Sequence, residues 1–230
     1  MADPSVVIVR NLSAEPETRQ VYARMGFKPH KADIPEAMKP LVIEAMALGR
    51  DLVNPIACFC SHRIIDVLPT LRSRQPDQPS GTETRQHEGV IKIDSAFAIE
   101  SEKAALRMAG CKEIYLMAVT IGPELDAKVA ELSQSGDMTR AFLLNAYGSE
   151  AAEALMESLN REITRQAEGR GLITTKRYSP GYGDWPITAQ RDLLGHLGGE
   201  RIGIRLTESC LMIPEKSVSA IIGVKPRAPQ

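Results

Sequence analysis

The chain has 230 residues, of which 43% are hydrophobic, and this is enough for a packed core in one large domain or two small ones. With 28 basic and 29 acidic residues, the formal net charge is −1, and the basic residues form no run or stripe. This composition excludes a general electrostatic attraction to nucleic acid or to an anionic membrane surface.

The N-terminus carries no targeting signal that the sequence can show. Residues 1–4 lack both the basic and the apolar segment of a signal peptide, and no apolar run approaches the roughly 20 residues that cross a bilayer. We therefore expect a cytoplasmic protein whose four cysteines, Cys58, Cys60, Cys111 and Cys210, are reduced thiols.

The first hundred residues predict short strands and helices joined by one polar loop. The expected elements are, in order, a strand at 6–9, a helix at 15–25, a helix that Pro35 opens and that ends near Gly49, a strand at 56–65, a polar loop at 72–88 that includes His87, and a strand at 90–93.

The strand at 56–65 contains the one arrangement in this half that resembles a metal site. Because side chains alternate along a strand, Cys58, Cys60 and His62 share one face. Zinc usually takes four ligands, and the other cysteines lie far away in the sequence. Cysteine is also an ordinary small buried residue. The sequence leaves both interpretations open, and we predict no metal site.

The second half predicts a central strand and a long helix. The expected elements are a helix at 102–109 capped by Ser101, a strand at 114–121 that is apolar on both faces, a helix that Gly122-Pro123 opens, a helix from Asp137 to about Glu168, a short helix from Thr188 to Leu197, strands at 202–206 and 217–224, and a tail at 225–230.

The long helix carries an apolar stripe at spacings of three and four. The stripe consists of Leu144, Tyr147, Ala151, Leu155, Leu159 and Ile163. Glu153 lies about 200° around the axis from Ala151, so its position alone predicts a solvated carboxylate. The small residues between 146 and 154 allow another element to approach the helix closely.

A Pro-Gly turn with neighbouring aromatics follows the long helix, at Lys176–Pro186. Pro180 fixes φ, and Gly181 allows a positive φ. Arg177 offers a planar set of donors suited to a carboxylate. Tyr182 and Trp185 offer ring faces that attract a cation. The stretch therefore suits a zwitterion with an added positive centre, although a plain surface turn has the same composition.

This half contains four ordered motif pieces, namely Ala118–Gly122, Gly148–Glu153, the Arg177–Tyr182 segment Arg-Tyr-Ser-Pro-Gly-Tyr, and the segment Leu206–Ser219 with Leu-Thr-Glu-Ser and Pro-Glu-Lys-Ser-Val-Ser. Together they resemble the activation domain of cobalamin-dependent methionine synthase. Residues 1–100 match only loosely, and residues 101–224 carry the motifs. We expect one activation-domain-like domain over 1–230, with 225–230 as a tail.

The resemblance implies an S-adenosylmethionine site. In that family the Arg of the Pro-Gly loop holds the methionine carboxylate, and a Glu of the long helix faces the ligand. Carried over by motif position, the predicted binding residues are Arg177, Ser179, Gly181, Tyr182 and Glu153. It implies no catalytic residue and no metal ligand. Glu208, in Leu-Thr-Glu-Ser, either orients Arg177 or caps a turn.

The resemblance also implies a fold and a role. The expected fold is α+β, a twisted and mainly antiparallel sheet with the long helix packed across it. The expected role is a reactivation subunit, not catalytic alone, that supports reductive methylation of cobalamin. The partner in trans is a cobalamin-carrying methyltransferase, most simply methionine synthase, with a flavodoxin-like electron donor.

One departure from the family motif keeps alternatives open. The family follows its loop Tyr with Pro-Ala-Cys-Pro-Asp-His, whereas this chain has Gly183–Thr188, Gly-Asp-Trp-Pro-Ile-Thr. The first alternative is an accessory subunit of another corrinoid methyltransferase. The second is a non-catalytic interaction protein with a vestigial pocket.

Overall fold

The computed structural model describes residues 6–27, 34–69, 89–95 and 97–227, so the predicted loop at 72–88 with His87 lies outside the described residues. The helices are α1 Thr18–Arg24, α2 Lys39–Leu52, α3 Glu102–Arg107, α4 Glu124–Gln134, α5 Met138–Glu168 and α6 Gln190–Leu197, with 3-10 turns η1 Ile187–Ala189 and η2 Gly199–Ile202. The strands are β1 Val7–Val9, β2 Ile56–Pro69, β3 Gly89–Ile93, β4 Ala98–Glu100, β5 Glu113–Thr120, β6 Leu172–Thr174, β7 Arg205–Leu206, β8 Met212–Ile213 and β9 Ser217–Pro226.

The main sheet has the strand order β4-β3-β2-β5-β9-β6, with β1 paired to β2, and each of these pairings is antiparallel. Strand β5 pairs with β2 along one edge and with β9 along the other. The prediction that 114–121 forms the central strand is therefore confirmed. Strands β7 and β8 form a separate hairpin, which we call the β7–β8 hairpin.

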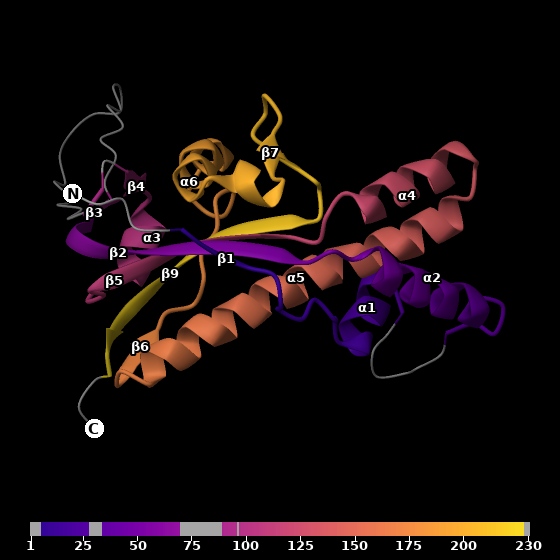
Figure 1. Cartoon of the computed structure of the whole chain (residues 1–230), viewed down its shortest axis with the longest axis horizontal. Helices are drawn as coiled ribbons and strands as arrows, with labels where there is room; N and C mark the ends of the chain where they lie inside the picture. The colour runs from indigo at the N-terminus through magenta and orange to yellow at the C-terminus, as the bar shows by residue number, and fades with distance from the viewer. Residues whose placement is uncertain (1–5, 28–33, 70–88, 96, 228–230) are drawn as a thin grey trace, which may run out of the picture.

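The sheet separates two apolar cores, and β5 contributes to both. Tyr115, Met117 and Val119 face the core around α5, while Ile114 and Leu116 face the core that contains α3 and α6. This alternation follows from the two-residue period of a strand. Figure 1 shows the arrangement, with α5 below the sheet and α6 with β7 above it. The predicted α+β fold with the long helix across the sheet is confirmed.

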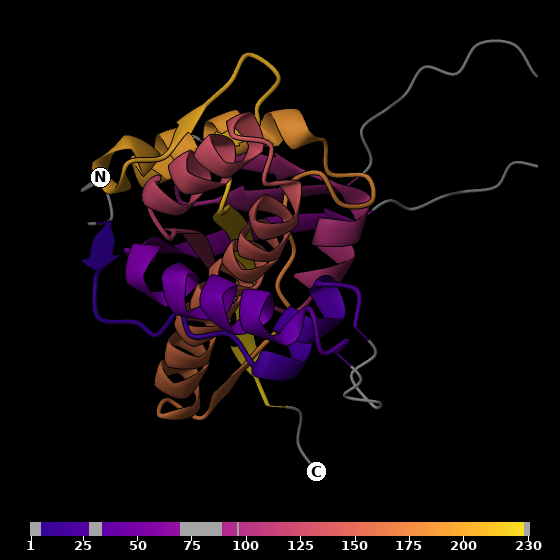
Figure 2. The ribbon, with the colours of Figure 1, turned by 90° about the vertical axis from the view of Figure 1, so that its right-hand side faces the viewer.

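Helix α5 begins where the sequence predicts it. The Asp137 side chain accepts a hydrogen bond from the backbone N–H of Arg140 at 3.1 Å and so caps the helix. The predicted apolar stripe is buried in the core. A Cβ added to Gly148 would lie 2.5 Å from Leu125 Cδ2, so the small residue at this position is what lets α4 approach. Figure 2, turned by 90°, shows α2 lying beside α5.

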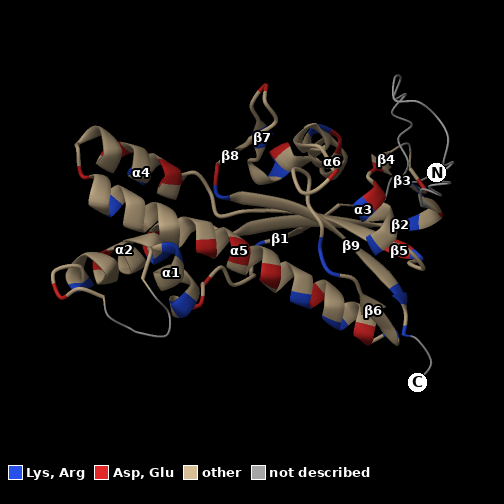
Figure 3. Cartoon of the chain, turned by 180° about the vertical axis from the view of Figure 1, so that it is seen from behind, with Lys and Arg blue, Asp and Glu red and all other residues tan. Residues whose placement is uncertain are grey.

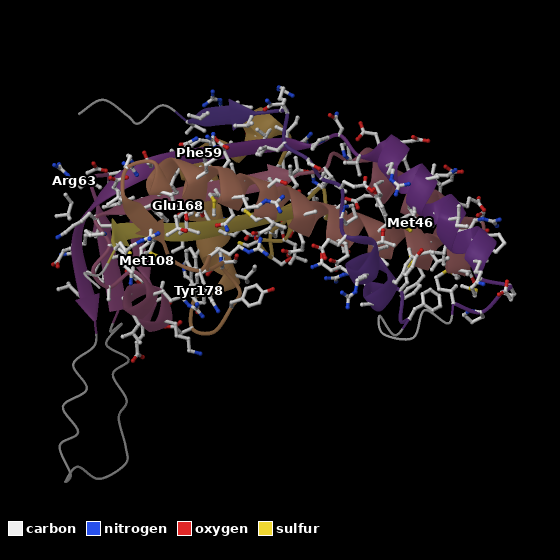
Figure 4. The ribbon with its side chains drawn as sticks, turned by 90° about the horizontal axis from the view of Figure 1, so that it is seen from below. Met46, Phe59, Arg63, Met108, Glu168 and Tyr178 are labelled. Atoms are coloured by element: carbon white, nitrogen blue, oxygen red, sulfur yellow. The ribbon has the colours of Figure 1, made fainter. Side chains whose placement is uncertain are left out.

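The second core lies on the face of the sheet that α3 and α6 cover. Met108 and Tyr178 both belong to it, and Figure 4 shows them near each other, with Met46 of α2 at the far end of the molecule. Ser101 caps α3 as predicted, because its hydroxyl accepts from the Ala104 N–H at 3.0 Å. This core supports the segment that follows β6.

Two predicted helix starts were wrong. Pro35 does not open α2; its carbonyl accepts from the Lys39 N–H, and Pro40 occupies the first helical turn instead. Thr188 does not cap α6. It lies inside η1, where the Ala189 N–H donates a hydrogen bond to the Pro186 carbonyl at 3.1 Å.

Two strand predictions near the C-terminus also needed correction. The expected strand at 202–206 shortens to β7, because Gly203 takes a φ of +81° and ends η2. The expected tail at 225–230 begins too early, since Lys225 and Pro226 continue β9 and pair with Ile173 and Leu172 of β6.

Charged residues are mixed over the surface. Figure 3 shows acidic and basic positions interspersed along α5. In the part of the chain that the structure describes, no helix combines the length and apolarity that a bilayer crossing requires.

Candidate functional site

A cavity of about 830 Å³ lies where the Pro-Gly loop, residues 176–186, meets the β7–β8 hairpin and the start of β9. Its lining comes from several elements that are distant in the sequence. The lining residues are Arg107, Glu153, Arg177, Tyr178, Ser179, Pro180, Tyr182, Ile187, Gln190, Thr207, Leu211, Met212, Ile213, Glu215, Ser217, Val218 and Ser219. A volume of this size accommodates a small organic ligand.

Backbone pairing with β9 sets the direction of Arg177. Tyr178 forms an antiparallel bridge with Ile221, through bonds of 2.9 Å and 2.8 Å between their backbone N–H and C=O groups. Neighbouring side chains of an extended segment point to opposite sides. Tyr178 therefore enters the core around α3, and Arg177 turns toward Glu153 of α5, while both residues contribute to the cavity lining.

Arg177 and Glu153 form an ion pair at the cavity wall. Arg177 Nη2 lies 2.5 Å from Glu153 Oε2, and the two side chains are 32% and 40% exposed. The other terminal nitrogen, Arg177 Nη1, is buried and has no hydrogen-bond partner among the described residues. A buried donor without an acceptor is costly, and a carboxylate oxygen from a ligand would satisfy it.

Two glycines give the Pro-Gly loop its shape. Gly181 has a φ of +88° and Gly183 a φ of +62°, both in the left-handed region that favours glycine. A Cβ on Gly183 would lie 2.5 Å from the Tyr178 hydroxyl, so a side chain there would displace the tyrosine. The Gly181 N–H closes the loop by donating to the Trp185 carbonyl at 2.8 Å.

Trp185 does not offer its ring to a ligand, and that expectation was wrong. The indole is 2% exposed and stacks on Tyr178, with ring centroids 5.9 Å apart and an interplanar angle of 15°. Arg107 lies over Tyr178, its guanidinium carbon 4.8 Å from the ring centroid. Tyr182, in contrast, is 65% exposed and lines the cavity. The turn thus buries one aromatic and presents the other.

Asp184 ties the loop to the start of α3. Its carboxylate accepts from the Ser101 hydroxyl at 2.8 Å and from the Lys103 N–H at 3.1 Å, and it lies 3.2 Å from the Tyr178 hydroxyl. Burial opposes ionisation of Asp184, but these hydrogen bonds outweigh it and lower the pKa of the carboxyl below its ordinary value. The Tyr178 hydroxyl also donates to the Tyr182 carbonyl at 2.7 Å.

The far wall of the cavity mixes apolar groups with polar groups whose hydrogen bonds are satisfied. Gln190 donates to the Cys210 carbonyl at 3.2 Å and accepts from the Ser219 hydroxyl at 2.8 Å. Leu211 and Ile213 of the hairpin segment are more than half exposed. Ser219 belongs to the Ser-Val-Ser motif, which was a signal in the sequence; Gln190 lies in no motif.

The structure brings most predicted site residues together. Arg177, Ser179, Tyr182 and Glu153 all line the cavity, whereas Gly181 lies outside the lining and shapes the loop. Glu208 is exposed in the turn that the Cys210 N–H closes onto the Thr207 carbonyl. The carboxylate beside Arg177 is Glu153, so no orienting role for Glu208 is found in the described residues.

Comparison with known proteins places this geometry in context. The family model for "Vitamin B12 dependent methionine synthase, activation domain" matches residues 105–229, the stretch that contains all four motif pieces. Among solved structures, the crystal structure of the MetH reactivation domain bound to AdoHcy is similar to this chain. The match has a TM-score of 0.61 and 18% identity, and covers 99% of this chain and 80% of that one. At this identity the likeness shows the fold.

Proposed function

Since the chain belongs to the vitamin B12 dependent methionine synthase activation domain family, whose model matches 105–229 of its 230 residues, we propose that its cavity binds S-adenosylmethionine. We further propose that the chain supplies this methyl donor for reductive methylation of cobalamin in a partner methyltransferase. The observation that carries the proposal is that Arg177 lines the cavity while its buried Nη1 has no hydrogen-bond partner among the described residues.

The charges along one wall fit the amino-acid end of S-adenosylmethionine. The ligand carboxylate accepts hydrogen bonds from Arg177, and the ligand ammonium lies beside Glu153. The Glu153 side chain is 40% exposed, so a ligand can reach it. In the unliganded chain these two side chains neutralise each other, at an Nη2 to Oε2 distance of 2.5 Å. A zwitterion can insert between them and keep both charges paired.

The remaining lining fits the rest of the molecule. Tyr182 offers an exposed ring, which attracts a sulfonium through its π face. Ser179 supplies a hydroxyl, and Leu211, Met212 and Val218 supply apolar surface for a nucleoside. The similar MetH reactivation domain was solved with AdoHcy, the molecule left when S-adenosylmethionine gives up its methyl group.

The chain's own contribution to the reaction is positional. A partner's reduced cobalamin would accept the methyl group, and S-adenosylhomocysteine would then leave the cavity of this chain. Arg177 and Glu153, which line the cavity, fix the amino-acid end of the methyl donor and so limit how the rest of the molecule lies. Such positioning lowers the barrier to methyl transfer, because the translational and rotational freedom of the donor is lost before the reaction. No acid or base in this chain is required.

Titration calorimetry with S-adenosylmethionine tests the binding step. We expect one site, and a loss of about 10- to 150-fold in affinity in Arg177→Ala, because a charge-assisted hydrogen bond contributes about 1.5–3 kcal/mol. Arg170→Ala is the matched control, since Arg170 makes a similar pair with Glu113, at 3.0 Å and 2.9 Å, outside the cavity lining. Equal affinity in both variants, or no binding at all, would sink the proposal.

A second assay tests the partner. The purified chain is added to an oxidised corrinoid methyltransferase with a reductant and methyl-labelled S-adenosylmethionine, and label on the corrinoid is measured. Methionine synthase is the expected client. Label transferred only to a different corrinoid protein would support the accessory-subunit alternative. If ligand binding holds but no corrinoid protein is labelled, the reactivation role is wrong.

A further inference from the structure

A second cluster of chemically active side chains lies apart from the cavity, on the other end of α6. Cys60 and His62 occupy alternate positions of β2 and point to the same face, as the sequence predicted. The third member is His196 in the last turn of α6. The Cys60 Sγ and one ring nitrogen from each histidine all lie within 4.8 Å of one another. Cys58 is not part of this group.

The geometry points to a site for a zinc-type divalent cation bound by Cys60, His62 and His196. This set is a thiolate with two imidazoles, which are ligands that zinc prefers. Cys60 is 2% exposed and the His62 side chain is fully buried. Two of the three ligands therefore lie in the interior, and His196 closes the cluster from a partly exposed position.

The hydrogen bonding of His62 leaves the right nitrogen available. Its Nδ1 lies 2.9 Å from Asp94 Oδ1, and a carboxylate accepts, so Nδ1 carries the proton. In the neutral ring, Nε2 then holds a lone pair, and this atom faces Cys60 and His196. A carboxylate that fixes the tautomer of a metal-binding histidine is the usual arrangement around zinc.

One ligand-atom distance matches a tetrahedral site, and another requires the two histidines to move apart. With Zn–S near 2.3 Å and Zn–N near 2.05 Å, tetrahedral angles place S and N about 3.6 Å apart and two nitrogens about 3.3 Å apart. Cys60 Sγ lies 3.6 Å from His62 Nε2. The two Nε2 atoms lie 2.7 Å apart, so the imidazoles must separate by about 0.6 Å for the cation to enter. Without a cation, the same pair forms a hydrogen bond.

The cation would hold α6 to β2. His196 sits in the last turn of α6, and Gln190 at its first turn lines the cavity. Phe97 stacks on His196, with ring centroids 5.6 Å apart, and shields the cluster on one side. Three protein ligands leave a fourth position for water or a further group. The inference does not depend on what the cavity binds.

Cobalt substitution tests the site in the full chain. The metal-free protein is titrated with Co²⁺ and followed by absorption, and Zn²⁺ content is measured after incubation with Zn²⁺ and desalting. We expect one equivalent of either metal, with a thiolate-to-cobalt charge-transfer band. The band should vanish in Cys60→Ala and affinity should fall at least about 10-fold in His196→Gln, since each loses one of three ligands.

Cys58→Ala is the matched control. Cys58 is a buried cysteine on the same face of the same strand, two residues before Cys60, and burial raises the pKa of its thiol to about 12. This variant should keep the band and the stoichiometry. Circular dichroism of each metal-free variant shows whether it is folded. If Cys60→Ala does not fold, His196→Gln tests the site instead, because His196 is partly exposed. Substoichiometric metal, or a band that survives in folded Cys60→Ala, overturns the inference and leaves a hydrogen-bonded pair of histidines.

Discussion

The carboxylate of Asp184 should contribute measurably to stability although it lies at the surface. It accepts from Ser101 at 2.8 Å and from Lys103 N at 3.1 Å, and lies 3.2 Å from the Tyr178 hydroxyl. Hydrogen bonds to charged groups contribute about 1.5–3 kcal/mol each, and water replaces part of this at an exposed site. We expect Asp184→Ala to lower the free energy of unfolding by about 2–3 kcal/mol.

Thermal and urea unfolding measure this change. For a chain of this size, about 2–4 °C of Tm is lost per kcal/mol, so Asp184→Ala should melt about 4–12 °C below the wild type. Asp51→Ala is the control, because Asp51 is exposed near the end of α2 and makes no hydrogen bond found in the described residues. It should change stability by less than about 0.5 kcal/mol.

Acid provides a second check on the same group. The folded-state pKa of Asp184 is lowered, so its stabilisation is fully present above the unfolded pKa of about 3.9 and is lost as pH falls through the folded value. The difference in the free energy of unfolding between the wild type and Asp184→Asn should therefore disappear below about pH 4. A gap that stays constant down to pH 2, or a loss of less than about 0.5 kcal/mol in Asp184→Ala, refutes the reasoning.

Three further predictions concern packing and the ligand. Gly49→Ala should lose about 1–2 kcal/mol in urea unfolding, because its Cβ would lie 2.2 Å from Tyr147 Cδ1, whereas Gly195→Ala, with nothing within 4 Å, should gain about 0.5–1 kcal/mol. Equal effects would show that the contact is easily relieved. Glu153→Gln should weaken S-adenosylmethionine binding by about 3- to 10-fold, since it removes a partly exposed charge; tighter binding would mean that Glu153 only competes for Arg177. Trp185 is the chain's one tryptophan and is 2% exposed, so native fluorescence should resist iodide quenching and become quenchable on unfolding. Ready quenching in the native state would contradict the buried stack.

Much of the architecture was predictable because local patterns and tertiary packing agree. The apolar stripe from Leu144 to Ile163 has the period of a helix that buries one side, and these residues are buried in the core. The run at 114–121 is apolar on both faces, which suits a central strand, and β5 has one core on each side. Asp137 and Ser101 cap their helices because the caps act within three residues.

The site was predictable only where a motif or a short spacing carried it. Arg177 and Glu153 were each assigned to the ligand, but their pairing with each other depends on how β9 holds the Pro-Gly loop against α5. Trp185 was expected to face a ligand because composition cannot show that Tyr178 stacks on it. The histidine pair joins positions 134 residues apart, a separation that no local pattern spans.

The proposed function requires Arg177 to bind the carboxylate of an amino-acid ligand. A structure of the chain with bound S-adenosylhomocysteine tests this most directly. We predict the ligand carboxylate within hydrogen-bond distance of Arg177 Nη1, the nitrogen that has no partner among the described residues. A ligand bound elsewhere, or bound in the cavity with Nη1 still unpaired, would contradict it.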